Sequence, residues 1–162
     1  MAGLLARFRR RLFRLPIHSF RLASSAWETA FGVPWILLVT TGRRSGRPHA
    51  VVLDVLGCDP LRGTCFVQSA RGTRSQWFRN LEANPRVEAR LRTKRFAAHA
   101  ARVPEEKERE IVREYVLAHP LYARVVARGL GYRGPLTATA ELVEWLTASF
   151  PMIAVTPLRP PD

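Results

Sequence analysis

Residues 35–56 read WILLVTTGRRSGRPHAVVLDVL, two apolar runs separated by a short basic segment. The apolar runs, 35–40 and 50–56, are rich in residues that favour strands, and Asp54 is the only charged residue in them. The segment between them holds two glycines and three arginines, a composition typical of a turn. This stretch therefore predicts two antiparallel strands joined by a basic loop.

The rest of the chain extends this hairpin into a mixed fold. After a turn predicted at 57–63, the hydrophobic pattern indicates four more strands, at residues 64–69, 87–91, 96–103 and 152–156. Helices are expected in five segments, at residues 17–30, 75–83, 104–118, 121–130 and 138–147. About six strands in meander order, with a helix between the third and the fourth, predict an α+β fold instead of a doubly wound sheet.

Length and charge limit the classes of protein and partner. The 162 residues suffice for one domain with a hydrophobic core. The 26 basic residues outnumber the 13 acidic ones, giving a net charge of +13, and all of them except Lys94 and Lys107 are arginines. An arginine surplus favours a partner with phosphates or carboxylates, such as nucleic acid, an anionic membrane or an anionic cofactor. Composition does not choose among these partners, and a GC-rich genome produces the same bias.

Two segments carry candidate chemistry. The loop at 42–49 brings three arginines and a serine into one glycine-containing turn, which suits the binding of a phosphate or of several carboxylates. The same composition is also common in solvated surface turns, and the loop lacks the spacing of a P-loop. The second segment, 69–81, adds hydrogen-bond donors beside Trp77 and Asn80. Taken alone, Trp77 is typical of a core residue and Asn80 of a surface or capping residue.

Together, the motifs TTGRRSGRP at 40–48 and WFRNLxxNP at 77–85 resemble those of a known family. This is the deazaflavin-dependent nitroreductase family, the F420-dependent quinone reductases of the split β-barrel flavin-binding superfamily. The likeness covers about residues 35–155. It implies an FMN-binding-like split β-barrel of about six mainly antiparallel strands with flanking helices. The expected division of the chain is a basic amphipathic helical segment, a cofactor-binding barrel domain and a tail, at residues 1–33, 34–158 and 159–162.

The resemblance also implies coenzyme F420 as the cofactor and assigns its contacts. The phosphate and oligoglutamate tail of F420 would be held by Arg43, Arg44, Ser45 and His49. The deazaflavin ring would lie along the second strand, at Ala50, Val51, Val52, Leu53 and Asp54. The next loop and the start of the following helix would complete the site with Val67, Gln68, Ser69, Arg71, Gln76, Trp77 and Asn80.

Tyr122 is the candidate catalytic residue, as a proton donor or a substrate clamp. The family often carries three tyrosines after its long helix, and this sequence keeps only the middle one. Plain core packing of Tyr122 is an equal alternative, and the missing tyrosines leave the rate and the choice of substrate open. Residues 127–147 add a helix that the compact members lack, which predicts a reshaped acceptor pocket.

Two further features concern location and metal binding. Cys58 and Cys65 lack the spacing of a metal site, so we expect no bound metal and a reduced, cytoplasmic protein. No apolar run reaches the roughly 18 residues that span a bilayer. Residues 4–15 form a basic amphipathic pattern. This segment either lies on the anionic inner face of the cell membrane or covers the mouth of the barrel.

The function expected from the resemblance is hydride transfer from reduced F420 to a quinone-like or nitro-aromatic acceptor, by a monomer or a homodimer. Three alternatives stay open: an F420-binding protein with little turnover, a split barrel that binds FMN instead, and a nucleic-acid-binding module. The last is disfavoured because the arginines lie in turns without interleaved exposed aromatic residues. We therefore expect no nucleic-acid partner.

Overall fold

The computed structural model describes residues 25–135, 137 and 139–159. The basic amphipathic helix expected at 4–15 and the last residues of the expected tail lie outside this part of the chain. In the described part, residues 25–31 are helical and end at Gly32, which has φ 70°. They are the C-terminal part of the helical segment expected at 17–30.

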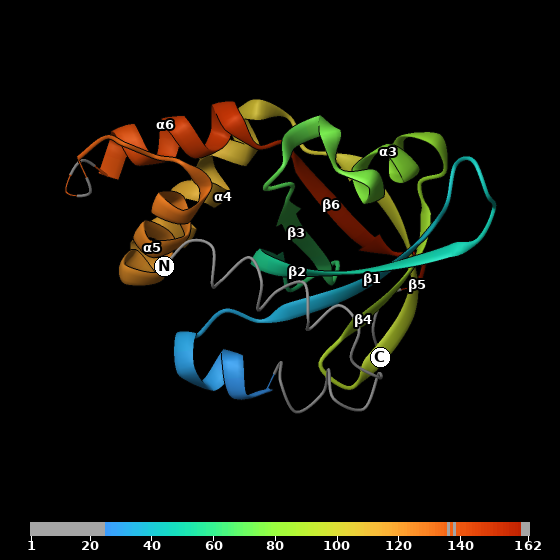
Figure 1. Cartoon of the computed structure of the whole chain (residues 1–162). Helices are drawn as coiled ribbons and strands as arrows, with labels where there is room; N and C mark the ends of the chain where they lie inside the picture. Colours follow the sequence, from blue (N-terminus) through green and yellow to red (C-terminus); the bar gives the residue numbers. More distant parts are fainter. Residues whose placement is uncertain (1–24, 136, 138, 160–162) are drawn as a thin grey trace.

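Six strands of the described chain close into an antiparallel barrel in the order β1-β2-β3-β6-β5-β4 (Figure 1). Their bounds are β1 Trp35–Thr41, β2 Pro48–Asp59, β3 Thr64–Gln68, β4 Arg86–Leu91, β5 Lys94–Arg102 and β6 Met152–Pro157. The last strand pairs with both β3 and β5, so the barrel closes through a pairing between segments far apart in the sequence. The α+β prediction is confirmed, and the barrel is of the split β-barrel type.

The predicted turn at 57–63 is wrong in its first half. Strand β2 continues to Asp59, and Cys58 lies opposite Cys65 in the β2–β3 register. An irregularity between Val55 and Gly57 lets the strand continue across the glycine. The turn starts only at Asp59, whose carboxylate Oδ1 accepts the backbone N–H of Leu61 at 2.9 Å.

Helices flank the barrel, and three of them form a layer on one side of it (Figure 1). Their bounds are α3 Gln76–Ala83, α4 Glu105–Ala118, α5 Pro120–Leu130 and α6 Thr139–Ser149, with a 3-10 turn, η1, at Gly72–Arg74. The four helices expected after the first three strands are confirmed to within about two residues at each end, and the start of the helix expected at 17–30 lies outside the described residues. Residues 129–134 match the GxGxxG spacing, but they end α5 and do not link a strand to a helix.

Two hydrophobic cores hold these layers together. One fills the barrel around Ile36, Leu38 and Val67, with Phe78 of α3 closing one end. The other lies between α4, α5, α6 and the outer face of the barrel. The helical layer is packed around its own core. A cleft therefore lies between β2 on one side and α5 with residues 25–31 on the other.

Candidate active site

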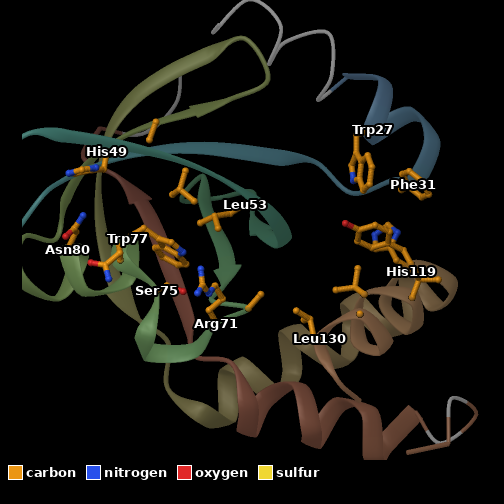
Figure 2. Close-up of a pocket in the computed structure, with 18 of the residues that line it drawn as sticks. Trp27, Phe31, His49, Leu53, Arg71, Ser75, Trp77, Asn80, His119 and Leu130 are labelled. Atoms are coloured by element: carbon orange, nitrogen blue, oxygen red, sulfur yellow. The ribbon is translucent and has the colours of Figure 1, made fainter. Parts of the chain in front are cut away.

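A cleft of about 1270 Å³ runs from the β1–β2 loop, past β2 and the start of α3, to α5 and residues 25–31. Figure 2 shows its lining, with His49, Asn80 and Trp77 toward one end and Trp27, Phe31 and His119 toward the other. The first end is basic and the second is aromatic. The cleft thus has two chemically different ends joined by a largely apolar wall.

At the basic end, α3 holds the β1–β2 loop. The side-chain oxygen Oδ1 of Asn80 accepts hydrogen bonds from the backbone N–H and from Nη1 of Arg43, both at 3.2 Å. Gln76 Oε1 accepts a second bond from the same Nη1 at 2.9 Å. Asn80 Nδ2 in turn donates to Thr40 Oγ1 at 3.3 Å. The two motifs, which 28 residues of sequence separate, therefore form one structural unit.

The loop itself is tightly closed. The N–H of Gly46, which has φ 64°, donates to the carbonyl of Gly42 at 2.8 Å. A Cβ atom on Gly42 would lie 2.6 Å from Ser45 Oγ and 2.7 Å from His49 Nε2, so a larger residue there would displace these two side chains. Ser45 Oγ also accepts the N–H of Arg47 at 3.3 Å. Gly42 thus allows the serine and the histidine to face the same point of the cleft.

The guanidinium groups of this end lack acidic partners. Within the described ranges, no Asp or Glu side chain forms an ion pair with Arg43, Arg44 or Arg71, and the ion pairs that exist there involve other cations, Arg92, Arg95, Lys107 and Arg109. Cations that line a cleft without acidic neighbours create a positive potential inside it. The basic end is therefore suited to an anion.

The middle of the cleft is formed by β2 and by the loop before α3. Ala50, Val51 and Leu53 line it from the strand, and Trp77 lines it from the helix. The buried Ser69 hydroxyl bonds to the Gly72 carbonyl and to Ser75 Oγ, each at 2.8 Å, and so fixes the loop that carries Arg71. A flat ring system fits between such apolar walls.

Five residues predicted to contact the cofactor do not line the cleft: Val52, Asp54, Val67, Gln68 and Ser69. Side chains alternate along β2, so Val52 and Asp54 lie on the face opposite Val51 and Leu53. Val67 is fully buried in the barrel core. Gln68 points away from the cleft, because its amide donates to Glu108 Oε1 at 2.9 Å and to the Phe150 carbonyl at 3.0 Å.

The aromatic end contains residues that the sequence did not identify. Trp27 and Phe31 stack at a centroid distance of 4.5 Å, and Tyr122 lies 5.5 Å from Phe31 and 5.9 Å from Trp27. Figure 2 shows His119 across the cleft from the two residues of the N-terminal helix. The i, i+4 spacing of Trp27 and Phe31, at the C-terminal end of the helical segment expected at 17–30, was the one available signal.

A salt bridge between Glu28 and Arg92 links residues 25–31 to the barrel. Arg92, in the β4–β5 turn, donates to the carboxylate of Glu28, including a bond from Nε at 3.2 Å. This hydrogen bond lowers the pKa of Glu28 below its ordinary value. The contact places the neighbouring Trp27 over the cleft. The Trp27 indole N–H is buried and has no hydrogen-bond partner among the described residues.

Tyr122 lines the cleft and donates its hydroxyl proton to Asp54 Oδ2 at 2.9 Å. Behind this pair, burial and then the charge of Asp54 raise the pKa of Tyr115 far above its ordinary value. Tyr115 therefore stays protonated, whereas Tyr122 is coupled to a carboxylate. The candidate catalytic residue is thus both part of the cleft wall and part of a half-buried polar contact.

A closed antiparallel six-stranded barrel with flanking helices defines a protein with the split β-barrel fold. One solved structure with this fold is a pyridoxamine 5'-phosphate oxidase-related, FMN binding protein from Nostoc punctiforme, with 13% identity over 90% of this chain and 83% of that chain and a TM-score of 0.56. A model of the F420H(2)-dependent quinone reductase family matches residues 13–130, and the chain belongs to this family. It is thereby an F420-dependent oxidoreductase in the broad sense.

Two further structures share the fold. An F420-H2 dependent reductase is 21% identical over 75% of this chain and 93% of that chain, with a TM-score of 0.50. A conserved hypothetical protein from Mycobacterium tuberculosis is 18% identical over 84% of this chain and 81% of that chain, with a TM-score of 0.52. No curated protein matches the chain significantly. Among the described helices, none has the length and apolar character needed to cross a bilayer.

Proposed function

We propose that this protein binds coenzyme F420 in the cleft and reduces a quinone-like or nitro-aromatic acceptor. The observation that carries the proposal is the order of surfaces along the cleft. Guanidinium groups without an ion-pair partner among the described residues come first, then an apolar wall, and then an aromatic pocket. This order matches a cofactor with an anionic tail and a flat ring, followed by a flat acceptor. Family membership supports the same assignment.

The residues at the basic end fit the anionic part of the cofactor. Arg43 is held by Gln76 and Asn80, so its guanidinium loses little freedom on binding. We assign the phosphate and the tail of F420 to the basic end, with contacts from Arg43, Arg44, Ser45, His49 and Arg71. The ring would lie against Ala50, Val51, Leu53 and Trp77, and the residues behind these walls, among them Val52, Val67, Gln68 and Ser69, would support them.

The aromatic end would bind the acceptor. When bound, reduced F420 supplies two electrons as a hydride. Tyr122 lines the cleft at this end and is a polar residue placed to contact an acceptor there. Asp54 accepts a hydrogen bond from the Tyr122 hydroxyl, and this bond fixes the orientation of the phenol. The aromatic side chains of Trp27, Phe31 and Tyr122 would form an apolar wall beside the acceptor ring.

Titration with F420, followed by its fluorescence, tests the cofactor assignment. Two charge-assisted contacts of about 1.5 kcal/mol each predict that Arg43→Ala combined with Arg44→Ala weakens binding on the order of 100-fold. The matched control is Arg62→Ala combined with Arg113→Ala, which removes the same charge from exposed positions outside the cleft. Equal weakening in both double variants would show that only net charge matters and would reject the assignment.

Turnover is tested separately, by following oxidation of reduced F420 with menadione and with a nitroimidazole. Oxidation with either acceptor supports the proposed reductase. Tight binding of F420 without oxidation would instead support a cofactor-binding protein with little turnover. If the purified protein carries a yellow ligand with the mass of FMN, the cofactor assignment fails while the fold assignment stands.

We also propose that the segment at 1–33 brings the barrel domain, residues 34–158, to an anionic membrane surface. Its basic amphipathic pattern supports this. Co-sedimentation with vesicles that contain an anionic phospholipid should be lost when residues 1–15 are deleted, while F420 binding persists. Retention of the truncated protein by the vesicles would contradict the proposal.

A further inference from the structure

The two cysteines of the chain are neighbours across the β2–β3 ladder. Cys58 and Cys65 are directly opposite in the strand register, and their Sγ atoms are 3.0 Å apart. Both are free thiols, and neither lines the cleft. The proposed reductase chemistry therefore leaves this dithiol without a role.

The two thiols differ in a way that suits sequential chemistry. Cys58 is exposed, whereas Cys65 is 2% exposed and belongs to the barrel core. A hydrogen bond from Cys65 lowers the pKa of Cys58, with the positive charge of Arg92 adding to the effect against the opposing effect of burial. The same hydrogen bond, together with burial, raises the pKa of Cys65. Cys58 is thus the more accessible and the more acidic of the two thiols, and Cys65 is the buried thiol beside it.

We propose that Cys58 and Cys65 are a redox modification site, which a peroxide converts into a reversible intramolecular disulfide. Their sulfur atoms need to approach by only about 1 Å to reach the bond length of about 2.05 Å. The strands that carry them are already paired, so closure requires side-chain movement alone. This inference does not depend on the cofactor or on the proposed reductase activity.

The chemistry balances in two steps. The Cys58 thiolate attacks one peroxide oxygen, the O–O bond breaks, and the other oxygen leaves as water after taking a proton, which gives a sulfenic acid on Cys58. The Cys65 sulfur then attacks the Cys58 sulfur, the S–O bond breaks, and a second water leaves with the Cys65 proton. In total, two thiols lose two electrons and hydrogen peroxide gains them. An external dithiol reverses the reaction.

The disulfide would tie β2 to β3 around the short turn at Asp59–Thr64, next to the irregularity between Val55 and Gly57. Closing this short loop reduces the freedom of the unfolded chain. The oxidised protein should therefore unfold at a Tm higher by about 5 °C, and a dithiol should remove the increase.

The test is intact-mass measurement of the full chain after treatment with hydrogen peroxide. We expect a loss of 2 Da, equal to two hydrogen atoms, together with a cross-linked peptide joining Cys58 to Cys65 and recovery of both thiols with dithiothreitol. In Cys65→Ala the 2 Da loss should vanish, and Cys58 should instead give a sulfenic acid that dimedone traps. Cys58→Ala should be inert to dimedone.

The wild-type measurement decides the matter even if a substitution at the buried Cys65 unfolds the barrel. The inference is overturned if both thiols still react with a maleimide after peroxide treatment. It is also overturned if the oxidised product is a Cys58–Cys58 dimer, since a partner chain would then have outcompeted Cys65. A 2 Da loss that persists in Cys65→Ala would contradict it as well.

Discussion

Asn80 joins the two motifs of the site, so its replacement tests how the cleft is assembled. The residue is 4% exposed, and its side chain makes two bonds to Arg43 and one to Thr40. In Asn80→Ala all three bonds are lost. Each contributes about 0.5–1.5 kcal/mol net, so we expect the free energy of unfolding to fall by about 2–3 kcal/mol.

The same variant should bind F420 about tenfold more weakly, because Arg43 is no longer oriented and must be ordered on binding at a cost of about 1.4 kcal/mol. Asn80→Asp separates orientation from charge. Its carboxylate keeps the acceptor for Arg43 but neutralises the guanidinium, so F420 affinity should fall as far as in Asn80→Ala while the loop stays fixed. Denaturant unfolding and F420 fluorescence titration measure the two quantities.

Asn84→Ala is the matched control for these variants. Asn84 lies at the C-terminal end of the same helix and accepts only the N–H of Arg86 from the next strand. It should lower stability slightly and leave F420 affinity unchanged. The reasoning is refuted if Asn80→Ala binds F420 as tightly as the wild type, or if Asn80→Asp binds it more tightly.

Three more predictions follow from the geometry. Gly42→Ala should displace the side chains of Ser45 and His49, because its Cβ would lie 2.6 Å from Ser45 Oγ and 2.7 Å from His49 Nε2, and F420 affinity measured by fluorescence should fall while the barrel stays folded. Tyr122→Phe and Asp54→Asn should each lower the kcat for menadione more than they alter the Kd for F420, since their 2.9 Å bond lies at the acceptor end. Burial raises the pKa of Glu108, so its stabilising effect is complete below its unfolded pKa and is lost as the pH rises through its folded pKa. In the wild type this effect makes the free energy of unfolding fall as the pH rises from 4 to about 8. Glu108→Gln should remove this contribution to the pH dependence, whereas an unchanged pH dependence would contradict the assignment.

The contact between Glu28 and Arg92 connects helical residues 25–31 with the β4–β5 turn of the barrel. Because Trp27 and Phe31 stand over the aromatic end of the cleft, this contact also shapes the proposed acceptor pocket. Residues 25–31 are therefore part of the proposed site, and a variant lacking them would present a wider and wetter cleft to an acceptor.

The sequence by itself determined the local structure and the family. Apolar runs, turn glycines and helix starts report on neighbouring residues, so the strands and helices were predicted with small errors at their ends. The error at Gly57 has a specific cause. A glycine was interpreted as the start of a turn, whereas pairing of Cys58 with Cys65 carries the strand past it.

Only the tertiary structure decided which residues meet in the cleft. Arg43 lies 37 positions from Asn80, and Tyr122 lies 68 positions from Asp54, yet both pairs are hydrogen-bonded. Such contacts depend on closure of the barrel and on the face of each strand, and local periodicity does not encode the way two distant segments are brought together. Gln68 illustrates the same limit. The family resemblance implied a cofactor contact for Gln68, whereas in the closed barrel its side chain bonds to the buried Glu108.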